Sequence, residues 1–207
     1  MLKKIKAYWY NLKTEYENIY GEAFLKDFDK SKEYLEKMQS YLLAKQEESP
    51  SNVDVACTLA SVNLELSGDE DGYVEFLENF LEEFDSSLDD KDKARIYTNI
   101  AFVEDYSRKA LDYLTKAKDL KSPFAETYTA LGLYNFSEYE YSGNVKNLEL
   151  SREFFETAKG IDESYESAMN YAVSLYELKQ YEKAKTIFLD LLRTYPDRMW
   201  LKLCIAY

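Results

Sequence analysis

The 207-residue chain contains no histidine, only two cysteines, six glycines and three prolines. Without histidine, zinc sites and histidine-dependent catalysis are excluded from the reading of this sequence. Cys57 and Cys204 are far apart and lack metal-ligand spacing, which favours two reduced thiols acting as small core hydrophobes. Because 46% of the residues are apolar and glycine and proline are scarce, the composition favours a packed, helix-rich chain of one domain or a short repeat array over disorder.

Positive charge is also scarce, since the formal net charge is -13. Nucleic acids and anionic lipids are bound by clustered lysine and arginine, so neither is expected as a partner. Between Glu65 and Asp92 the chain carries twelve acidic residues and one lysine. Such a run is typical of a solvated face, and the alternative is a docking patch for a basic partner. No apolar stretch is long enough for a signal peptide or a membrane span, so we expect a cytoplasmic protein without membrane contact.

Recognisable catalytic motifs are missing as well. The sequence has no glycine-rich phosphate loop and no nucleophile elbow, and no spacing of serine, lysine or tyrosine singles out a reactive set. The acidic turn SGDEDG at 67–72 does not fit the spacing of a calcium loop, and we interpret it as a turn with a capping acid. We therefore predict a protein that is not an enzyme, with no catalytic, cofactor-binding or metal-binding residues.

Residues 165–198 show the clearest helical pattern. Apolar residues recur every three or four positions on both sides of a break near Lys179, which predicts two amphipathic helices in a hairpin. Ala172 and Ala184 are small residues that allow the two helices to approach closely. Pro196 is expected to end the second helix, because proline lacks an N–H group and restricts its neighbour.

The same pattern recurs earlier in the chain, over 91–120 and 123–161. The second helices of the three hairpins share one internal spacing, in Ala110/Leu114/Ala117, Ser151/Phe155/Ala158 and Ala184/Phe188/Leu191. A more degenerate hairpin is predicted over 53–85, with a helix capped by Asn52 or Asp54. Helices are also expected over 2–19, which has a basic face, and from Phe28 to about residue 47, and a short one is expected near the C-terminus. Internal repeats of this length indicate a helical solenoid.

These hairpins resemble tetratricopeptide repeats, through a large–small pair in the first helix, the pattern Y-x-x-A-x-x-x-F in the second, and a closing proline. The resemblance is strongest over 91–198. It implies an all-α, right-handed superhelix of antiparallel helical hairpins. We expect one domain over 1–207, with an N-terminal capping hairpin at 1–50, repeats at 53–198 and a C-terminal capping segment at 199–207. One hairpin departs from the family's length, because Gly132 and Ser151 are nineteen residues apart where Ala172 and Ala184 are twelve apart. The seven extra residues, around 138–146, predict either two longer helices or a protruding loop.

The resemblance further implies that the first helix of each hairpin lines a concave groove that binds peptides. The groove positions carried over from the family are Arg95, Asn99, Phe102, Thr129, Leu133, Phe136, Asn170, Val173 and Tyr176. Asn99 and Asn170 match positions where family members bond the backbone of a ligand, and the alternative is that each bonds a neighbouring helix or water. Arg95 is the only basic residue in these positions, so capture of a C-terminal carboxylate is not expected.

The sequence therefore predicts a non-enzymatic adaptor or regulator that binds a protein or peptide segment, basic in character because the groove has an acidic rim. One alternative is a self-associating structural or scaffold protein, favoured by the apolar C-terminal sequence MWLKLCIAY. A second is an acidic mimic of nucleic acid that uses residues 65–92 to block a partner. A third alternative, the sensing of peptide pheromones, is less expected, because relatives with that role join such an array to a DNA-binding or catalytic domain that we do not expect in these 207 residues.

Overall fold

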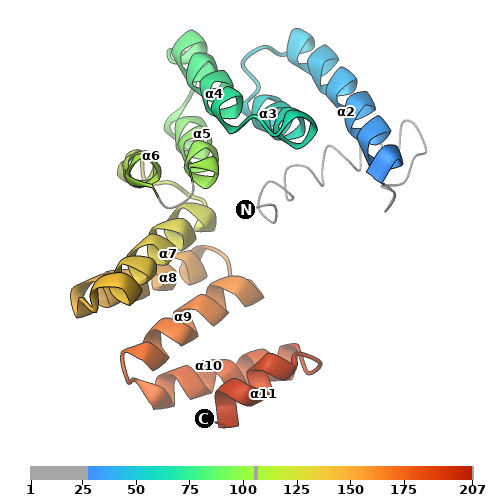
Figure 1. Cartoon of the computed structure of the whole chain (residues 1–207). Coiled ribbons are helices and arrows are strands. Elements are labelled where there is room, and N and C mark those ends of the chain that lie inside the picture. Colours follow the sequence, from blue (N-terminus) through green and yellow to red (C-terminus); the bar gives the residue numbers. More distant parts are fainter. Residues whose placement is uncertain (1–27, 105–106, 207) are drawn as a thin grey trace. The chain divides into compact units, whose positions relative to one another are not determined.

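The computed structural model describes residues 28–104 and 107–206, and every regular element in these ranges is an α-helix (Figure 1). The prediction of an all-α chain is thereby confirmed, whereas the helix expected over 2–19 lies outside the described residues. The helices, in chain order, are Phe28–Glu48 (α2), Val53–Ser67 (α3), Glu70–Phe84 (α4), Asp90–Val103 (α5), Arg108–Asp119 (α6), Ala125–Ser142 (α7), Val145–Ile161 (α8), Tyr165–Glu177 (α9), Tyr181–Thr194 (α10) and Met199–Ala206 (α11). None of these helices has the length and apolarity needed to span a bilayer.

Two polar caps and a glycine explain where α3 begins and ends and where α4 begins. The Asn52 side chain accepts a hydrogen bond from the Val55 N–H at 3.1 Å, so Asn52 rather than Asp54 caps α3. Gly68 then adopts a left-handed φ of 69°, which glycine tolerates and which ends the helix. The Asp69 carboxylate accepts from the Gly72 N–H at 2.9 Å and starts α4. The SGDEDG segment is thus a turn with a capping acid, as predicted. Each such cap contributes about 1 kcal/mol to helix stability.

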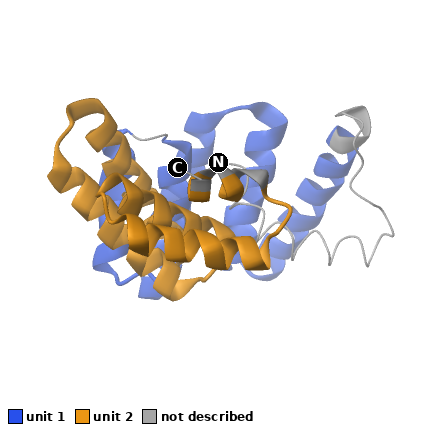
Figure 2. Ribbon diagram, turned by 90° about the horizontal axis from the view of Figure 1, so that it is seen from below, with its two compact units in different colours: residues 1–122 blue, residues 123–207 orange. Residues whose placement is uncertain are grey.

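The described helices fall into two compact units, one ending at Ser122 and the other beginning at Pro123 (Figure 2). In the first, which we call unit 1, α2 packs on α3, α3 on α4 and α5, and α5 on α6. Its fully buried side chains include Met38, Leu59 and Ile96. Helix α4 buries large residues where a repeat normally has a small one, among them Leu77 and Phe80. The first hairpin of unit 1 is accordingly held by bulky side chains.

Unit 2 consists of α7 to α11, and each helix packs on the next one in the chain. Ala172 on α9 and Ala184 on α10 are 0% and 1% exposed, so the two small residues lie in the core of their hairpin as predicted. Phe188 and Leu201 belong to the same buried cluster, through which α11 covers the last hairpin. Helix α10 ends at Thr194, two residues before Pro196.

The hairpin of α7 and α8 is longer than the others. Its helices contain 18 and 17 residues, whereas α9 and α10 contain 13 and 14. Gly143, with a left-handed φ of 68°, and the capping residue Asn144 form a tight turn between α7 and α8. The extra residues around 138–146 therefore lengthen both helices and do not form a protruding loop.

A glycine allows α7 and α8 to approach closely. A Cβ atom placed on Gly132 would lie 2.4 Å from the Cε1 atom of Phe155, a distance at which the ring must move. The Ser151 hydroxyl donates to the Gly132 carbonyl oxygen at 2.8 Å, which joins the two helices at the same point. The predicted pairing of Gly132 with Ser151 and Phe155 is therefore present, and it requires a residue without a side chain.

Candidate functional site

The nine predicted binding residues are divided between the two units. Helix α5 of unit 1 carries Arg95, Asn99 and Phe102. Unit 2 carries the remaining six, with Thr129, Leu133 and Phe136 on α7 and Asn170, Val173 and Tyr176 on α9. We describe the two sets separately.

Arg95 is an internal ion-pair partner within unit 1. Its side chain is only about one-tenth exposed, and its guanidinium donates to Asp54 Oδ1 of α3 at 2.5 Å. The two residues are 41 positions apart in the sequence, so the pair joins the first turn of α3 to the second turn of α5. The Arg95 guanidinium is therefore already paired with a carboxylate of its own unit.

Asn99 also makes contacts inside unit 1. Its amide nitrogen donates to the Arg95 carbonyl oxygen at 3.0 Å and lies 3.6 Å from the sulfur of Cys57 on α3. Burial raises the pKa of the Cys57 thiol well above its usual value, so this sulfur is protonated and unreactive at neutral pH. The Asn99 amide nitrogen thus contacts both its own helix and the neighbouring α3. Phe102 is half-buried nearby on the same helix.

On α7 the three predicted residues form a mostly apolar stripe. Thr129 is 3% exposed, and its hydroxyl donates to the Ala125 carbonyl oxygen at 3.0 Å, so its polar group is used within the helix. Leu133 and Phe136 are half-buried, and the Phe136 ring lies edge-on to Tyr139 with 6.2 Å between ring centroids. This stripe can offer apolar contact to a ligand.

Helix α9, which contacts α7 directly, differs from α5 at the matching asparagine. Asn170 is half-buried, and its amide forms no hydrogen bond with any residue that the structure describes. Val173 packs against the core cluster of unit 2 and remains half-exposed. Tyr176 is 37% exposed, with its ring edge-on to Tyr181 at 5.2 Å. An amide donor and acceptor therefore lie beside apolar and aromatic surface on this helix.

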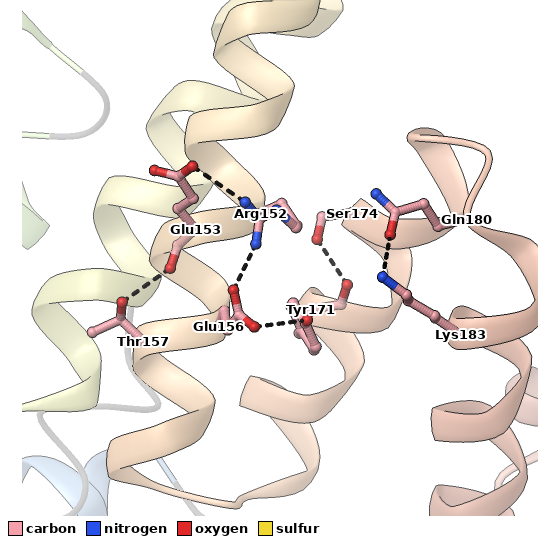
Figure 3. A network of polar contacts seen from close by, with 8 residues as sticks. All are labelled: Arg152, Glu153, Glu156, Thr157, Tyr171, Ser174, Gln180 and Lys183. Atoms are coloured by element: carbon pink, nitrogen blue, oxygen red, sulfur yellow. Dashed lines mark hydrogen bonds and ion pairs between the residues drawn. The ribbon is translucent and has the colours of Figure 1, made fainter.

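A polar network on α8 and α9 fixes the position of this helix (Figure 3). Arg152 donates to Glu156 at 2.6 Å and to Glu153 at 3.2 Å, and the Tyr171 hydroxyl donates to the other oxygen of Glu156 at 3.1 Å. Burial and the hydrogen bond to the Glu156 carboxylate raise the pKa of Tyr171. Because Tyr171 directly follows Asn170, the network holds the backbone that carries the asparagine.

The acidic residues of α4 lie on its exposed side. Two acidic residues in and just after this helix interact with side chains of α6 and α5. Glu78 accepts a hydrogen bond from the Tyr113 hydroxyl of α6, and Asp85, just after the helix, pairs with Lys93 at 2.6 Å. Among the described residues, no group of three or more acidic or cysteine side chains is arranged to hold a metal ion. The acidic side chains of α4 are thus exposed, with a few contacts inside unit 1.

The sequence reasoning missed a feature of the charges on α7 and α9. Every charged side chain of these two helices is a glutamate, as the sequence of each helix shows: Glu126, Glu138, Glu140, Glu166 and Glu177. Adding the charges helix by helix, rather than along the whole chain, would have revealed this pattern.

Comparison with known families identifies the last complete hairpin. Residues 166–198 match the tetratricopeptide repeat family, within the part of the chain where the resemblance was expected to be strongest. No curated protein sequence matches the chain. The resemblance stated from the residues is therefore confirmed.

Solved structures with the same fold cover most of the chain. YrrB, described as a TPR protein with an unusual peptide-binding site, is 16% identical, with a TM-score of 0.59 over 79% of this chain and 79% of YrrB. PilF of Pseudomonas aeruginosa is 20% identical, with a TM-score of 0.57 over 84% of this chain and 80% of PilF. MamA of Desulfovibrio magneticus, from residue 41 to its end, is 16% identical, with a TM-score of 0.56 over 96% and 99%. The chain thus has the fold of a tetratricopeptide-type solenoid of antiparallel helical hairpins, which confirms the predicted fold class.

Proposed function

We propose that this protein is a non-enzymatic adaptor or regulator that binds a segment of another protein on the face formed by α7 and α9 of unit 2. The observation that carries the proposal is the combination on that face of the Asn170 amide, which forms no hydrogen bond with the residues that the structure describes, and partly exposed apolar side chains. An extended segment presents backbone donors and acceptors that such an amide can satisfy, while its side chains pack on the apolar stripe. Leu133, Phe136, Val173 and Tyr176 would supply that packing, and Thr129 would support it from within α7.

Two further observations support this proposal. Among proteins of the same fold, YrrB is described as having a peptide-binding site. The two thiols of the chain also suit a role other than catalysis, because burial raises the pKa of Cys57 and of Cys204 and so disfavours the reactive thiolate. We place the protein in the cytoplasm, as its two free cysteines suggest.

The proposal extends to α5 of unit 1 in a weaker form. There Phe102 would supply apolar contact, while Asn99 has already committed its amide nitrogen to unit 1. Arg95 would act indirectly, because its ion pair with Asp54 sets the position of α5. We therefore expect substitution of Asn99 to weaken binding less than substitution of Asn170.

The experiment compares captures from native lysate, identified by mass spectrometry, by three versions of the full chain. They are the wild type, the variant Asn170→Ala/Tyr176→Ala, and a matched control that removes the same residue types at the far end of the α7–α8 hairpin, Tyr141→Ala/Asn147→Ala. Tyr141 is 92% exposed, so the control is expected to fold normally. A partner retained by the wild type and the control but lost by the α9 variant supports the proposal.

The other outcomes point to different functions. A partner lost only with Tyr141 and Asn147 would move recognition to the lengthened hairpin and contradict the proposal. A partner retained by all three versions would also contradict it. If no partner is captured, light scattering of the purified chain tests the alternative of self-association, which a strict monomer at high concentration would exclude.

A further inference from the structure

In unit 2, acidic and basic residues are distributed unequally among the helices. Helices α7 and α9 contain five glutamates and no lysine or arginine. All basic residues between Pro123 and Tyr207 lie instead on α8, α10, α11 and the connecting turns, namely Lys146, Arg152, Lys159, Lys179, Lys183, Lys185, Arg193, Arg198 and Lys202. The first helices of the two hairpins in this unit are thus purely acidic, whereas the second helices are mixed.

Four of the five glutamates lie at the ends of the apolar stripes. On α7 the order is Glu126, Thr129, Leu133, Phe136 and Glu140, with alternating steps of three and four residues that keep all of them on one side of the helix. On α9 the same steps place Glu166 and Glu177 on either side of Asn170 and Val173. At a rise of 1.5 Å per residue, the two carboxylates are about 21 Å apart along α7 and about 17 Å apart along α9.

Within the described part of the chain, none of these carboxylates has a basic partner. The glutamates of α7 and α9 form no ion pair or side-chain hydrogen bond with any residue that the structure describes. In contrast, three of the five carboxylates on α8 and α10 are paired within their own helix, by Arg152 and Arg193. In unit 2 the basic residues therefore pair with carboxylates of α8 and α10, and not with the glutamates of α7 and α9.

Helix stability does not explain the positions of Glu140 and Glu177. Carboxylates in the first turn of a helix, such as Glu126 and Glu166, are favoured by the helix dipole, and carboxylates in the last turn are disfavoured. Glu140 lies in the last turn of α7 and Glu177 is the last residue of α9. Both therefore occupy positions that their own helix makes unfavourable, which points to a role outside the helix.

We propose that the α7–α9 face binds a segment with an apolar centre and lysine or arginine on both sides of it. The inference rests on the proposed function and adds the chemistry of the partner. Basic side chains at the two ends of the segment would pair with Glu126 and Glu166 at one end of the face and with Glu140 and Glu177 at the other. A span of 17 to 21 Å corresponds to about six extended residues, so a short linear segment is sufficient.

The test begins with a library of random 12-residue peptides displayed on phage and selected on the full-length wild-type chain. Enriched peptides are synthesised with a fluorophore, and their affinities are measured by anisotropy for three proteins that differ in which surface is altered. The face variant replaces the four flanking glutamates by glutamine, at Glu126, Glu140, Glu166 and Glu177. The control makes the same charge change at four exposed glutamates of α4 that have no ion pair, at Glu70, Glu75, Glu82 and Glu83.

The expected result is an enrichment of peptides with lysine or arginine on both sides of apolar residues. Their dissociation constants should rise about tenfold in the face variant at low salt and remain unchanged in the control, as expected for a few solvent-exposed charge pairs. The difference should shrink at 0.5 M salt, because screening weakens exposed pairs. Equal losses in both variants would mean diffuse attraction to an acidic protein and would overturn the inference.

The remaining outcomes separate this inference from the proposed function. Enriched peptides without a basic bias, or with affinities unchanged by the four glutamines, overturn the inference. If such peptides still lose affinity with Asn170→Ala/Tyr176→Ala, the proposed function stands without it. If the enriched peptides bind the Asn170→Ala/Tyr176→Ala variant normally, or if no peptide is enriched, both the inference and the proposed function are contradicted.

Discussion

Asn99 on α5 and Asn170 on α9 occupy the same predicted recognition position in different surroundings. In unit 1 the asparagine donates to the Arg95 carbonyl oxygen and contacts Cys57, and Arg95 itself is paired with Asp54. In unit 2 the asparagine forms no hydrogen bond with a described residue, although its neighbour Tyr171 is held by Glu156. The same residue type thus joins helices in one unit and remains available in the other. Whether the asparagine at this repeat position can bond a ligand therefore depends on the residues that pack beside it, and the repeat pattern alone does not show this.

The charges of the two units sharpen this comparison. Helix α5 carries Lys91, Lys93 and Arg95 among its aspartates, and two of these bases form ion pairs within unit 1. The charged residues of α7 and α9 are all glutamates, and none of them forms an ion pair with a residue that the structure describes. We therefore expect α5 to respond to mutation mainly through stability, and the α7–α9 face mainly through binding.

The largest expected effect on stability is at the ion pair of unit 1. Asp54→Ala removes the carboxylate that accepts from the largely buried Arg95 guanidinium and should lower the free energy of unfolding by about 1.5–3 kcal/mol, the net value of a hydrogen bond between charged groups. Urea unfolding followed by circular dichroism measures this. The matched control is Asp71→Ala, which removes another first-turn aspartate that has no ion pair and should cost less than about 1 kcal/mol. Equal effects would show that Arg95 does not depend on Asp54.

The next effect lies at the close approach of α7 and α8 in unit 2. Gly132→Ala places a methyl group against the Phe155 ring and should destabilise the chain by about 1–3 kcal/mol through overpacking. The control is Gly160→Ala on α8, where the added methyl group meets no atom within 4 Å. That substitution should stabilise the helix by up to about 1 kcal/mol, because alanine is the better helix former. A stabilising Gly132→Ala would mean that Phe155 moves aside freely.

Local signals in the sequence were sufficient for the helices but not for the contacts between them. The start of α3, with Asn52 or Asp54 as its cap, and the turn over 67–72 were predicted, because capping depends on residues within one turn. The long hairpin left two alternatives, since extra residues can lengthen helices or form a loop, and the left-handed Gly143 shows that they lengthen helices. The Arg95–Asp54 pair could not be predicted, because it joins residues 41 positions apart.

A smaller effect is expected at the network that supports α9. Tyr171→Phe removes the hydroxyl that donates to Glu156 and should lower the free energy of unfolding by about 0.5–1.5 kcal/mol, the usual net value of one hydrogen bond. Tyr176→Phe is the matched control, because the Tyr176 hydroxyl bonds to no described residue, and it should change stability by less than about 0.5 kcal/mol. If both variants behave alike in thermal unfolding, Glu156 does not anchor α9.

The smallest effect on stability is expected at the two glutamates at the ends of α9. It tests the difference between the units sharply, because one of the two substitutions should stabilise the chain and still weaken binding. Glu177→Gln removes a carboxylate from the last residue of α9 and should stabilise the chain by about 0.3–1 kcal/mol at low salt, while Glu166→Gln in the first turn should destabilise it by a similar amount. Both substitutions should nevertheless lower the affinity of the chain for a basic peptide. Opposite shifts in thermal unfolding with a shared loss of affinity would separate binding from stability. A loss of affinity that followed stability instead would indicate that Glu166 and Glu177 act through the helix alone.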